Sequence, residues 1–304
     1  MKNFQYMLAL LVLLLFSNHV IGQKIKSVNQ NSKTKDSTEV KHEKDSSYVS
    51  LNLSYISDAV FLGRKDSVAM PYLYASAMYH HKSGIYGMGS LSYLTKANES
   101  RVDLFLASLG YDFSYNNFDG DISITKYFFN EDSYNVISQV SADVTVVLSY
   151  DFQYFNLAAT AANYFNNNST SDFFLSTEVS HDFITRNQKF QISPSVGLYF
   201  GSQNFYQEYY TNRGSSGQGQ GQGQGGTVNS TSGYNITVEE SETFNIMAIE
   251  FGLPVWYEVE PFIFMFYPTY VIPQSPSRLI VDDVVYEEDL DPTLYFVLGV
   301  SLKI

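Results

Sequence analysis

The sequence predicts an all-β fold, a closed antiparallel up-and-down transmembrane β-barrel of about 12 strands with short periplasmic turns and long outside loops. Three observations lead to it. Apolar and polar side chains alternate over long runs, the connections between these runs fall into two length classes, and the chain opens with a secretory signal. A soluble β-sandwich explains the alternation equally well, but it gives no reason for the sorting of the connections.

Residues 1–22 have the features of a cleaved signal peptide. Lys2 precedes an apolar run over 7–16, and small residues stand shortly before the expected cleavage site. This run is too short for a spanning helix, which needs about 20 apolar residues. Residues 23–47 are polar, rich in Lys and Ser, and without periodicity, so we expect a disordered periplasmic tail. The barrel is then predicted over residues 48–304.

The stretch QVSADVTVVLSYD, residues 139–151, shows the alternation most clearly. Its apolar side chains share the parity of Val144 and its polar side chains share the parity of Asp143, with Val147 as the exception. Successive side chains of a strand point to opposite faces. A membrane barrel turns its apolar face toward lipid and its polar face toward the lumen. We therefore expect Val144 to point outward and Asp143 to point inward.

The same alternation recurs along the rest of the chain. Most of the runs are about 10 to 13 residues long, whereas strands of soluble proteins average about 5 to 6 and tilted membrane-spanning strands need about 9 to 11. Strand length therefore favours a membrane barrel. The candidate strands lie near 48–56, 70–80, 85–95, 101–113, 118–129, 136–150, 153–164, 172–183, 189–200, 243–253, 260–271 and 292–304.

The connections between these strands alternate in length. Outer-membrane barrels combine short periplasmic turns with longer outside loops, so the alternation gives an independent test of the fold. The long connections are 57–68, 96–100, 130–134, 166–171, 201–242 and 274–291. The short connections are 82–84, 115–118, the join near Asp151, 185–188 and the bend around Glu258.

The segment 201–242 contains the Gly/Gln-rich stretch GQGQGQGQGG at 217–226. Glycine brings no side chain and glutamine little hydrophobicity, so we expect a flexible, solvated outside loop. A phosphate-binding loop would need a following Lys-Ser/Thr or a dinucleotide fingerprint that opens a helix, and the stretch has neither.

Composition excludes several classes of function. The chain has 304 residues with 25 Tyr and 23 Phe, which favours strands. Its net charge of -13 argues against nucleic acid, because phosphate binding requires clustered basic residues. Cysteine is absent, which removes disulfides, thiolate metal sites and the lipid anchor of a lipoprotein. We expect no cofactor and no metal.

The stretch FGLPVWYEVEPFIFMFYPTYVIPQ at 251–274 and the finish YFVLGVSLKI at 295–304 resemble outer-membrane β-barrel proteins of Bacteroidetes. The resemblance is most specific over 243–304. It implies a Gram-negative outer membrane, a penultimate strand that enters an outside loop through a Pro-Gln step, and a last strand that closes the barrel. It implies no particular activity. The sequence departs from the usual pattern at Ile304, where such strands commonly end in an aromatic residue.

Histidines provide little support for catalysis. Barrel hydrolases place a Ser and a His, or an Asp and a His, within hydrogen-bond reach at the outer rim. Beyond the signal peptide and the tail, only His80, His81 and His181 remain, and the topology puts all three at periplasmic strand ends. We expect His80 and His81 to point to opposite faces, which disfavours joint metal binding. The sequence therefore predicts no enzyme.

The lumen holds the candidate site. We predict an acidic lining, with few basic residues such as Lys126 on the same parity. A passive small-solute pore with a weak cation bias follows from that lining, and a non-conducting barrel that acts through its outside loops is the alternative. Expected partners are outer-membrane lipid, the barrel-assembly machinery during insertion and small solutes, with the oligomeric state left open. The predicted lumen-lining acids are Asp112, Asp143, Asp151, Glu178, Asp182 and Glu250.

Overall fold

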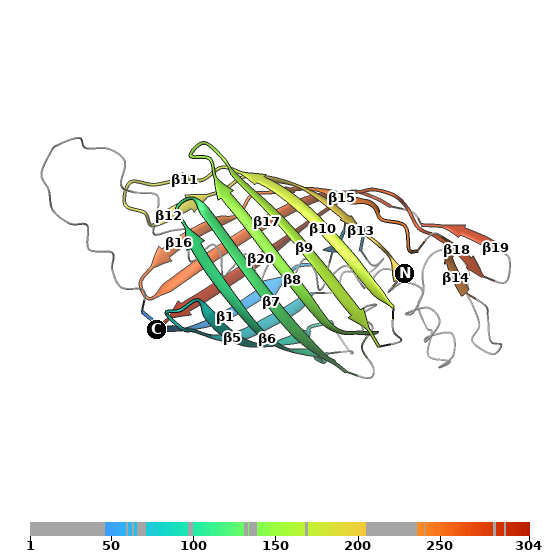
Figure 1. Cartoon of the computed structure of the whole chain (residues 1–304), viewed down its shortest axis with the longest axis horizontal. Coiled ribbons are helices and arrows are strands. Elements are labelled where there is room, and N and C mark those ends of the chain that lie inside the picture. The colour runs from blue at the N-terminus through green and yellow to red at the C-terminus, as the bar shows by residue number, and fades with distance from the viewer. Residues whose placement is uncertain are drawn as a thin grey trace, which may run out of the picture.

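The computed structural model of the chain is a closed barrel of 12 antiparallel strands, which confirms the predicted fold class (Figure 1). The predicted signal peptide and nearly all of the predicted tail lie outside the described residues. Among the residues that the structure describes, no helix has the length and apolar character to cross a membrane. The structure describes residues 46–304 except 59, 63, 66–70, 97–99, 131–132, 134–138, 168–169, 205–235, 240, 282–283 and 289.

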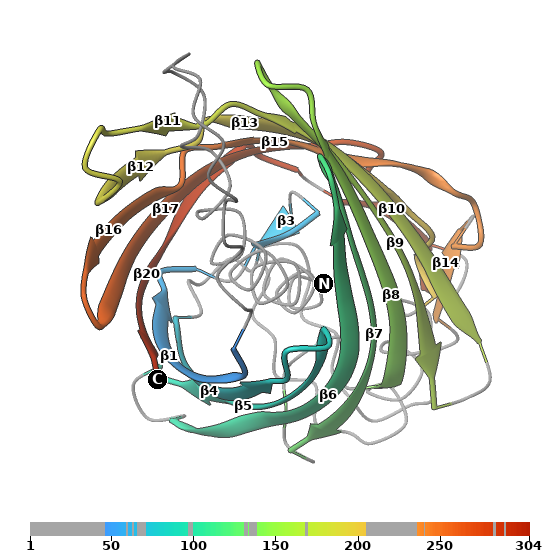
Figure 2. The same ribbon diagram turned by 60° about the vertical axis from the view of Figure 1, so that its left-hand side comes forward.

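Each barrel strand pairs with its neighbours along the chain, and β1 pairs with β20 to close the ring, which Figure 2 shows obliquely. The closing register runs from Ser50 opposite Lys303 to Ile56 opposite Val297. The barrel strands are β1 (Tyr48–Ile56), β4 (Tyr72–His80), β5 (Ile85–Leu94), β6 (Arg101–Tyr115), β7 (Phe118–Phe129), β8 (Val140–Asp151), β9 (Asn156–Asn166), β10 (Ser171–Ser180), β13 (Ser195–Gly201), β15 (Asn245–Gly252), β17 (Phe262–Pro273) and β20 (Thr293–Lys303).

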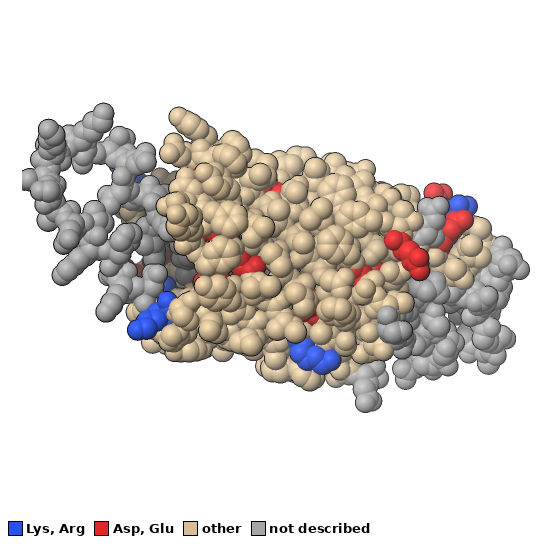
Figure 3. Space-filling model, in the orientation of Figure 1, with Lys and Arg blue, Asp and Glu red and all other residues tan. Residues whose placement is uncertain are grey.

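The outer surface of the barrel is apolar. Along each strand the exposed side chains are mostly large hydrophobic residues, while the alternate positions are buried and mostly polar, aromatic or small. On the face drawn in Figure 3, few charged side chains interrupt the wall. This inside-out pattern is the one that lipid requires of a barrel, and it rejects the soluble sandwich as an explanation of the alternation.

Three neighbouring strands are interrupted along one line, which we call the crease. There β10 gives way to β11 (Phe183–Ile184), β13 is preceded by β12 (Phe190–Ile192), and β15 is followed by β16 (Val255–Val259). Across the crease, backbone N–H groups donate to proline carbonyls: His181 to Pro194 at 3.2 Å, Ser193 to Pro254 at 3.0 Å and Leu253 to Pro268 at 3.0 Å. Because proline has no N–H, the ladder cannot continue through it.

The two ends of the barrel differ. At the short-turn end, where the chain also terminates in Figure 1, strands join through tight turns. The predicted bend around Glu258 is wrong by a few residues, because Glu258 lies within β16 and the turn occupies 260–261. β16 extends past Glu258 because it stays paired with β17 up to Val259, which lies opposite Phe262.

At the long-loop end, two loops contain strands that the sequence analysis did not predict. The loop 57–68 forms a hairpin of β2 (Val60–Phe61) and β3 (Arg64–Lys65). A separate sheet has the order β14 (Ile236–Glu239), β18 (Arg278–Val281) and β19 (Val284–Glu287). The prediction of one flexible loop over 201–242 is therefore wrong for its last part, while residues 217–226 lie outside the described residues.

Candidate functional site

The candidate site is the inner wall of the barrel, and β8 shows how the sequence builds it. Asp143, Thr145 and Ser149 point inward and are buried, whereas Leu148 and Tyr150 point outward and are 41% and 42% exposed. This is the orientation that the alternation predicts for the stretch. Polar side chains at the inward positions, apart from Val147, thus produce a polar stripe inside the barrel.

Asp143 lies at the centre of a hydrogen-bonded cluster on three neighbouring strands. The hydroxyl of Tyr127 on β7 donates to Oδ2 of Asp143, and Thr145 Oγ1 donates to Oδ1 at 2.7 Å. One strand further along the wall, Ser108 and Thr125 share a hydrogen bond of 3.0 Å. The side chain of Asp143 is fully buried, so these neutral donors replace the water that a carboxylate needs.

Glu178 and Glu250 form a second cluster close to the crease. Both pair in register with Gly197, which separates them on the strand between, so the two carboxylates share one level of the wall. Ser195 lies near Glu178, and Tyr199 lies near Glu250. Because Gly197 has no side chain, the space between the two acids is left to the ring of Tyr199. The structure therefore brings together two of the predicted acids.

The remaining predicted acids lie apart from these clusters. Asp112 is at the short-turn rim, where its Oδ2 lies 2.8 Å from His80 Nε2. Asp151 is the exposed last residue of β8 and accepts the backbone N–H of Gln153 at 2.6 Å. Asp182 lies in the crease, where it accepts hydrogen bonds from Ser193 and from Asn156. These three acids support turns and breaks rather than a single binding site.

Two buried acids at the long-loop end were missed by the sequence analysis. Asp103 accepts from Tyr72 at 3.2 Å and from Ser133 at 2.8 Å, and it pairs with Arg101 at 3.1 Å. The irregular register between Ser92 and Tyr93 on β5 shifts the parity beside Asp103, which hides it from a simple alternation count.

Asp172 is the other missed acid. It accepts Asn166 Nδ2 and Ser202 Oγ, each at 3.0 Å, and the backbone N–H of Asn204 at 2.7 Å. Asp172 shares the parity of Glu178 on β10, so the sequence did carry a signal that could have found it. Both missed acids fasten the first residues of loops to the barrel wall.

The inner wall is strongly biased toward negative charge. Lys126 was predicted on the polar parity, but it is exposed on the outer face because Thr125 and Tyr127 take the inward positions. Within the described barrel strands, the basic side chains that point inward are Arg101, beside Asp103, and Lys303, whose Nζ lies 4.0 Å from the ring of Tyr48. The inward acids are Asp103, Asp112, Asp119, Asp121, Asp143, Asp151, Asp172, Glu178 and Glu250.

The histidines lie at the short-turn end, as predicted. His80 is stacked on Tyr48 at a ring distance of 4.8 Å and contacts Asp112, whereas His81 contacts Ser83 in the turn. His181 contacts the carbonyl of Tyr154. In the part of the chain that the structure describes, no three His, Cys, Asp or Glu side chains are grouped so that they could hold a metal ion.

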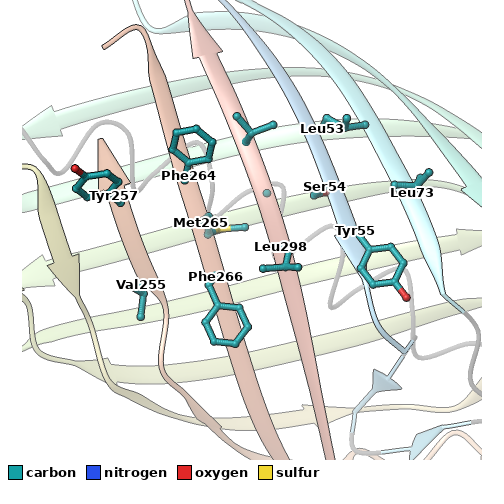
Figure 4. A pocket seen from close by; sticks show the side chains of 12 residues that line it. Leu53, Ser54, Tyr55, Leu73, Val255, Tyr257, Phe264, Met265, Phe266 and Leu298 are labelled. Atoms are coloured by element: carbon teal, nitrogen blue, oxygen red, sulfur yellow. The ribbon is translucent and has the colours of Figure 1, made fainter. Parts of the chain in front are cut away.

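A groove of about 490 Å³ opens on the outer wall, where β16, β17, β20 and β1 lie next to one another (Figure 4). The two tyrosines in its lining, Tyr55 and Tyr257, mark opposite sides, and Phe264, Phe266 and Leu298 lie between them. No acidic or basic side chain lines this groove. It therefore offers lipid a mainly apolar surface.

Comparison with known proteins finds similar solved structures but no similar sequence. No protein-family model and no curated protein matches the sequence. Solved structures that the chain resembles include the KdgM porin, at 8% identity over 83% of this chain and 98% of that chain with a TM-score of 0.45. The NanC porin is 12% identical over 84% and 100%, at 0.44, and LpxR from Salmonella typhimurium is 9% identical over 83% and 99%, at 0.43. Similarity at this level carries no functional argument.

Proposed function

We propose that the protein is an outer-membrane barrel that acts as a passive pore for small solutes with a weak bias toward cations. The observation that carries the proposal is the sign of the inner wall, where many carboxylates and only two basic side chains point inward in the described strands. Fixed negative charge in a narrow low-dielectric passage attracts cations and repels anions.

The location is part of the same proposal. An apolar outer wall, short turns at one end and long loops at the other are typical of Gram-negative outer-membrane barrels. The signal peptide predicted over 1–22 would deliver the chain to the periplasm, where the assembly machinery for such barrels would insert it into outer-membrane lipid. The resemblance of residues 243–304 to Bacteroidetes barrels agrees with this route.

Single-channel recording of the refolded protein in a planar lipid bilayer tests the pore. We expect discrete conductance steps and a reversal potential that shows cation preference in a salt gradient. The double substitution Glu178→Gln and Glu250→Gln should lower the cation-to-anion permeability ratio, and the difference should shrink at high salt, where charges are screened within about 3 Å at 1 M. The matched control is Lys126→Gln, which removes a charge from the outer face and should leave selectivity unchanged.

A non-conducting structural barrel is the second candidate, and the burial of the acids favours it. Asp103, Asp143 and Asp172 are each at most 1% exposed and accept hydrogen bonds from neighbouring side chains. Such a network can hold a closed interior together without any solute. Refolded protein that produces no conductance steps would reject the pore and leave the outside loops as the functional part.

A further inference from the structure

The sheet of β14, β18 and β19 extends beyond the long-loop end of the barrel (Figure 1). β19 lies at its edge, and among the described residues it pairs only with β18. All of its residues are exposed, and Val284, Val285 and Tyr286 have 52%, 47% and 44% of their surface accessible. An exposed edge strand with large apolar side chains is a template to which another extended chain can add.

The backbone of β19 directs hydrogen-bonding groups toward this open edge. The N–H of Glu288 donates to the carbonyl of Ser277 at 2.9 Å, so this pair is hydrogen-bonded. Hydrogen-bonded and non-hydrogen-bonded pairs alternate in an antiparallel ladder. Val285, three positions back and opposite Ile280, therefore belongs to a non-hydrogen-bonded pair. Its N–H and C=O point away from β18, where a docked strand would meet them.

The charge around the edge selects the partner. Over 278–291 the sequence has one basic residue, Arg278, which forms an ion pair of 2.6 Å with Glu239 of β14. Six acidic residues stand before Val284 and after Tyr286. A second copy in antiparallel pairing would bring together two copies of this acidic sequence, which is unfavourable between strands. A segment that carries Lys or Arg would instead meet opposite charge. In the sequence the acids are Asp282, Asp283, Glu287, Glu288, Asp289 and Asp291. Glu287 and Asp291 are exposed, whereas Glu288 is buried and accepts the backbone N–H of Ser277 at 3.1 Å.

We propose that β19 is a docking edge for an extended, Lys- or Arg-bearing segment of another protein, which adds to the sheet as a fourth strand. Backbone groups of Val285 and Glu287 supply the hydrogen bonds, and the exposed Val284 and Tyr286 supply apolar contacts. The exposed carboxylates of Glu287 and Asp291 supply charge complementarity. The interaction goes beyond the proposed pore and does not depend on whether the lumen conducts.

The test uses the full-length refolded barrel in detergent micelles and a fluorescent peptide of alternating lysine and valine, with binding followed by fluorescence anisotropy. Val285→Pro removes the N–H that faces the open edge and leaves the hydrogen bonds between β18 and β19 intact. We expect this substitution to weaken peptide binding by about tenfold, which is the effect of losing roughly one hydrogen bond between uncharged groups. Val285→Thr keeps the N–H and the branched side chain, and it should bind as the wild type does.

Further arms separate strand addition from general attraction to an acidic protein. A peptide with glutamate in place of lysine should not bind, and the lysine peptide should bind less tightly as salt rises. The lysine peptide methylated on alternate backbone nitrogens should lose binding, which tests strand addition even where Val285→Pro disturbs folding. Equal binding by the proline variant, equal binding by the methylated peptide, or self-association of the wild type through β19 would each overturn the proposal.

Discussion

The wall of the barrel has two arcs that differ in regularity. In the regular arc, β4 to β9, the strands are continuous and the ladders contain only single irregularities, between Ser92 and Tyr93 and between Val140 and Ala142. In the creased arc, β10 to β17, three successive strands are broken along one line. Both arcs have the same inside-out alternation. The comparison shows that alternation sets which side chains face lipid, whereas proline sets where a strand ends.

The largest expected effect tests the depth of each arc in the membrane. Val144→Arg places a charge on the outer face of the regular arc and should lower the free energy of unfolding by about 2–4 kcal/mol if it lies near mid-membrane. Phe183→Arg, on β11 beyond the crease, should lower the free energy of unfolding by only about 0–1 kcal/mol, the value typical of a position near the membrane–water interface. Urea titrations of both variants in lipid vesicles measure the difference. Equal costs would show that the crease does not mark the edge of the membrane.

The next effect concerns packing on the inner wall of the regular arc. A Cβ at Gly110 would lie 2.3 Å from the ring of Tyr86, so Gly110→Ala should destabilise the barrel by about 1–3 kcal/mol through overpacking. The matched control on β5 is Gly87→Ala, where a Cβ meets nothing within 4 Å. Thermal unfolding in detergent provides the measurement. A neutral Gly110→Ala would mean that the Tyr86 ring is free to move into the lumen.

A smaller effect should be confined to the creased arc. Asp182→Ala leaves Ser193 and Asn156 without their acceptor and should cost about 1 kcal/mol, since the site is only partly buried. Amide hydrogen exchange should rise in β11 and β12 and stay unchanged in β7 and β8. Faster exchange in both arcs would contradict the view that the crease isolates local opening from the rest of the wall.

The smallest effect tests the prolines themselves. Pro254→Ala should lower stability by about 0.4–1 kcal/mol, because the unfolded chain gains conformational freedom while the carbonyl that accepts the Ser193 N–H remains. Chemical denaturation measures it. A stabilised variant would indicate that the ladder can close across the crease once an N–H is supplied, and that proline alone maintains the break.

The fold was accessible from the sequence because a membrane barrel requires side chains of one kind on each face. Predicted strands such as 118–129 coincide with the observed bounds, and the opening stretch 139–151 has the predicted orientation. The short strands of the long-loop end were missed because β18 and β19 are shorter than the length that served to recognise membrane strands. Length is informative only where a bilayer imposes it.

The site was accessible only in part. Parity turned Asp143 and Glu250 inward, but it cannot show that Tyr127 donates a hydrogen bond to Asp143 or that Glu250 lies on the same level as Glu178. Those contacts depend on the register between strands. Lys126 was assigned to the wrong face of β7. Thr125 and Tyr127, the residues before and after it, point inward, so Lys126 points outward although it is polar. The sequence of one strand determines which of its side chains point inward, but it does not determine which side chains of the neighbouring strands they contact.

The close approach of Tyr86 to Gly110 affects the inner diameter of the barrel. A ring 2.3 Å from the position of a glycine Cβ lies flat along the wall, and Phe174 over Gly201 repeats the arrangement at 2.4 Å. The free cross-section inside is therefore governed by the smallest residues of the wall as much as by the largest. Substitutions at these glycines would push the rings inward and narrow the bore while leaving every charge in place.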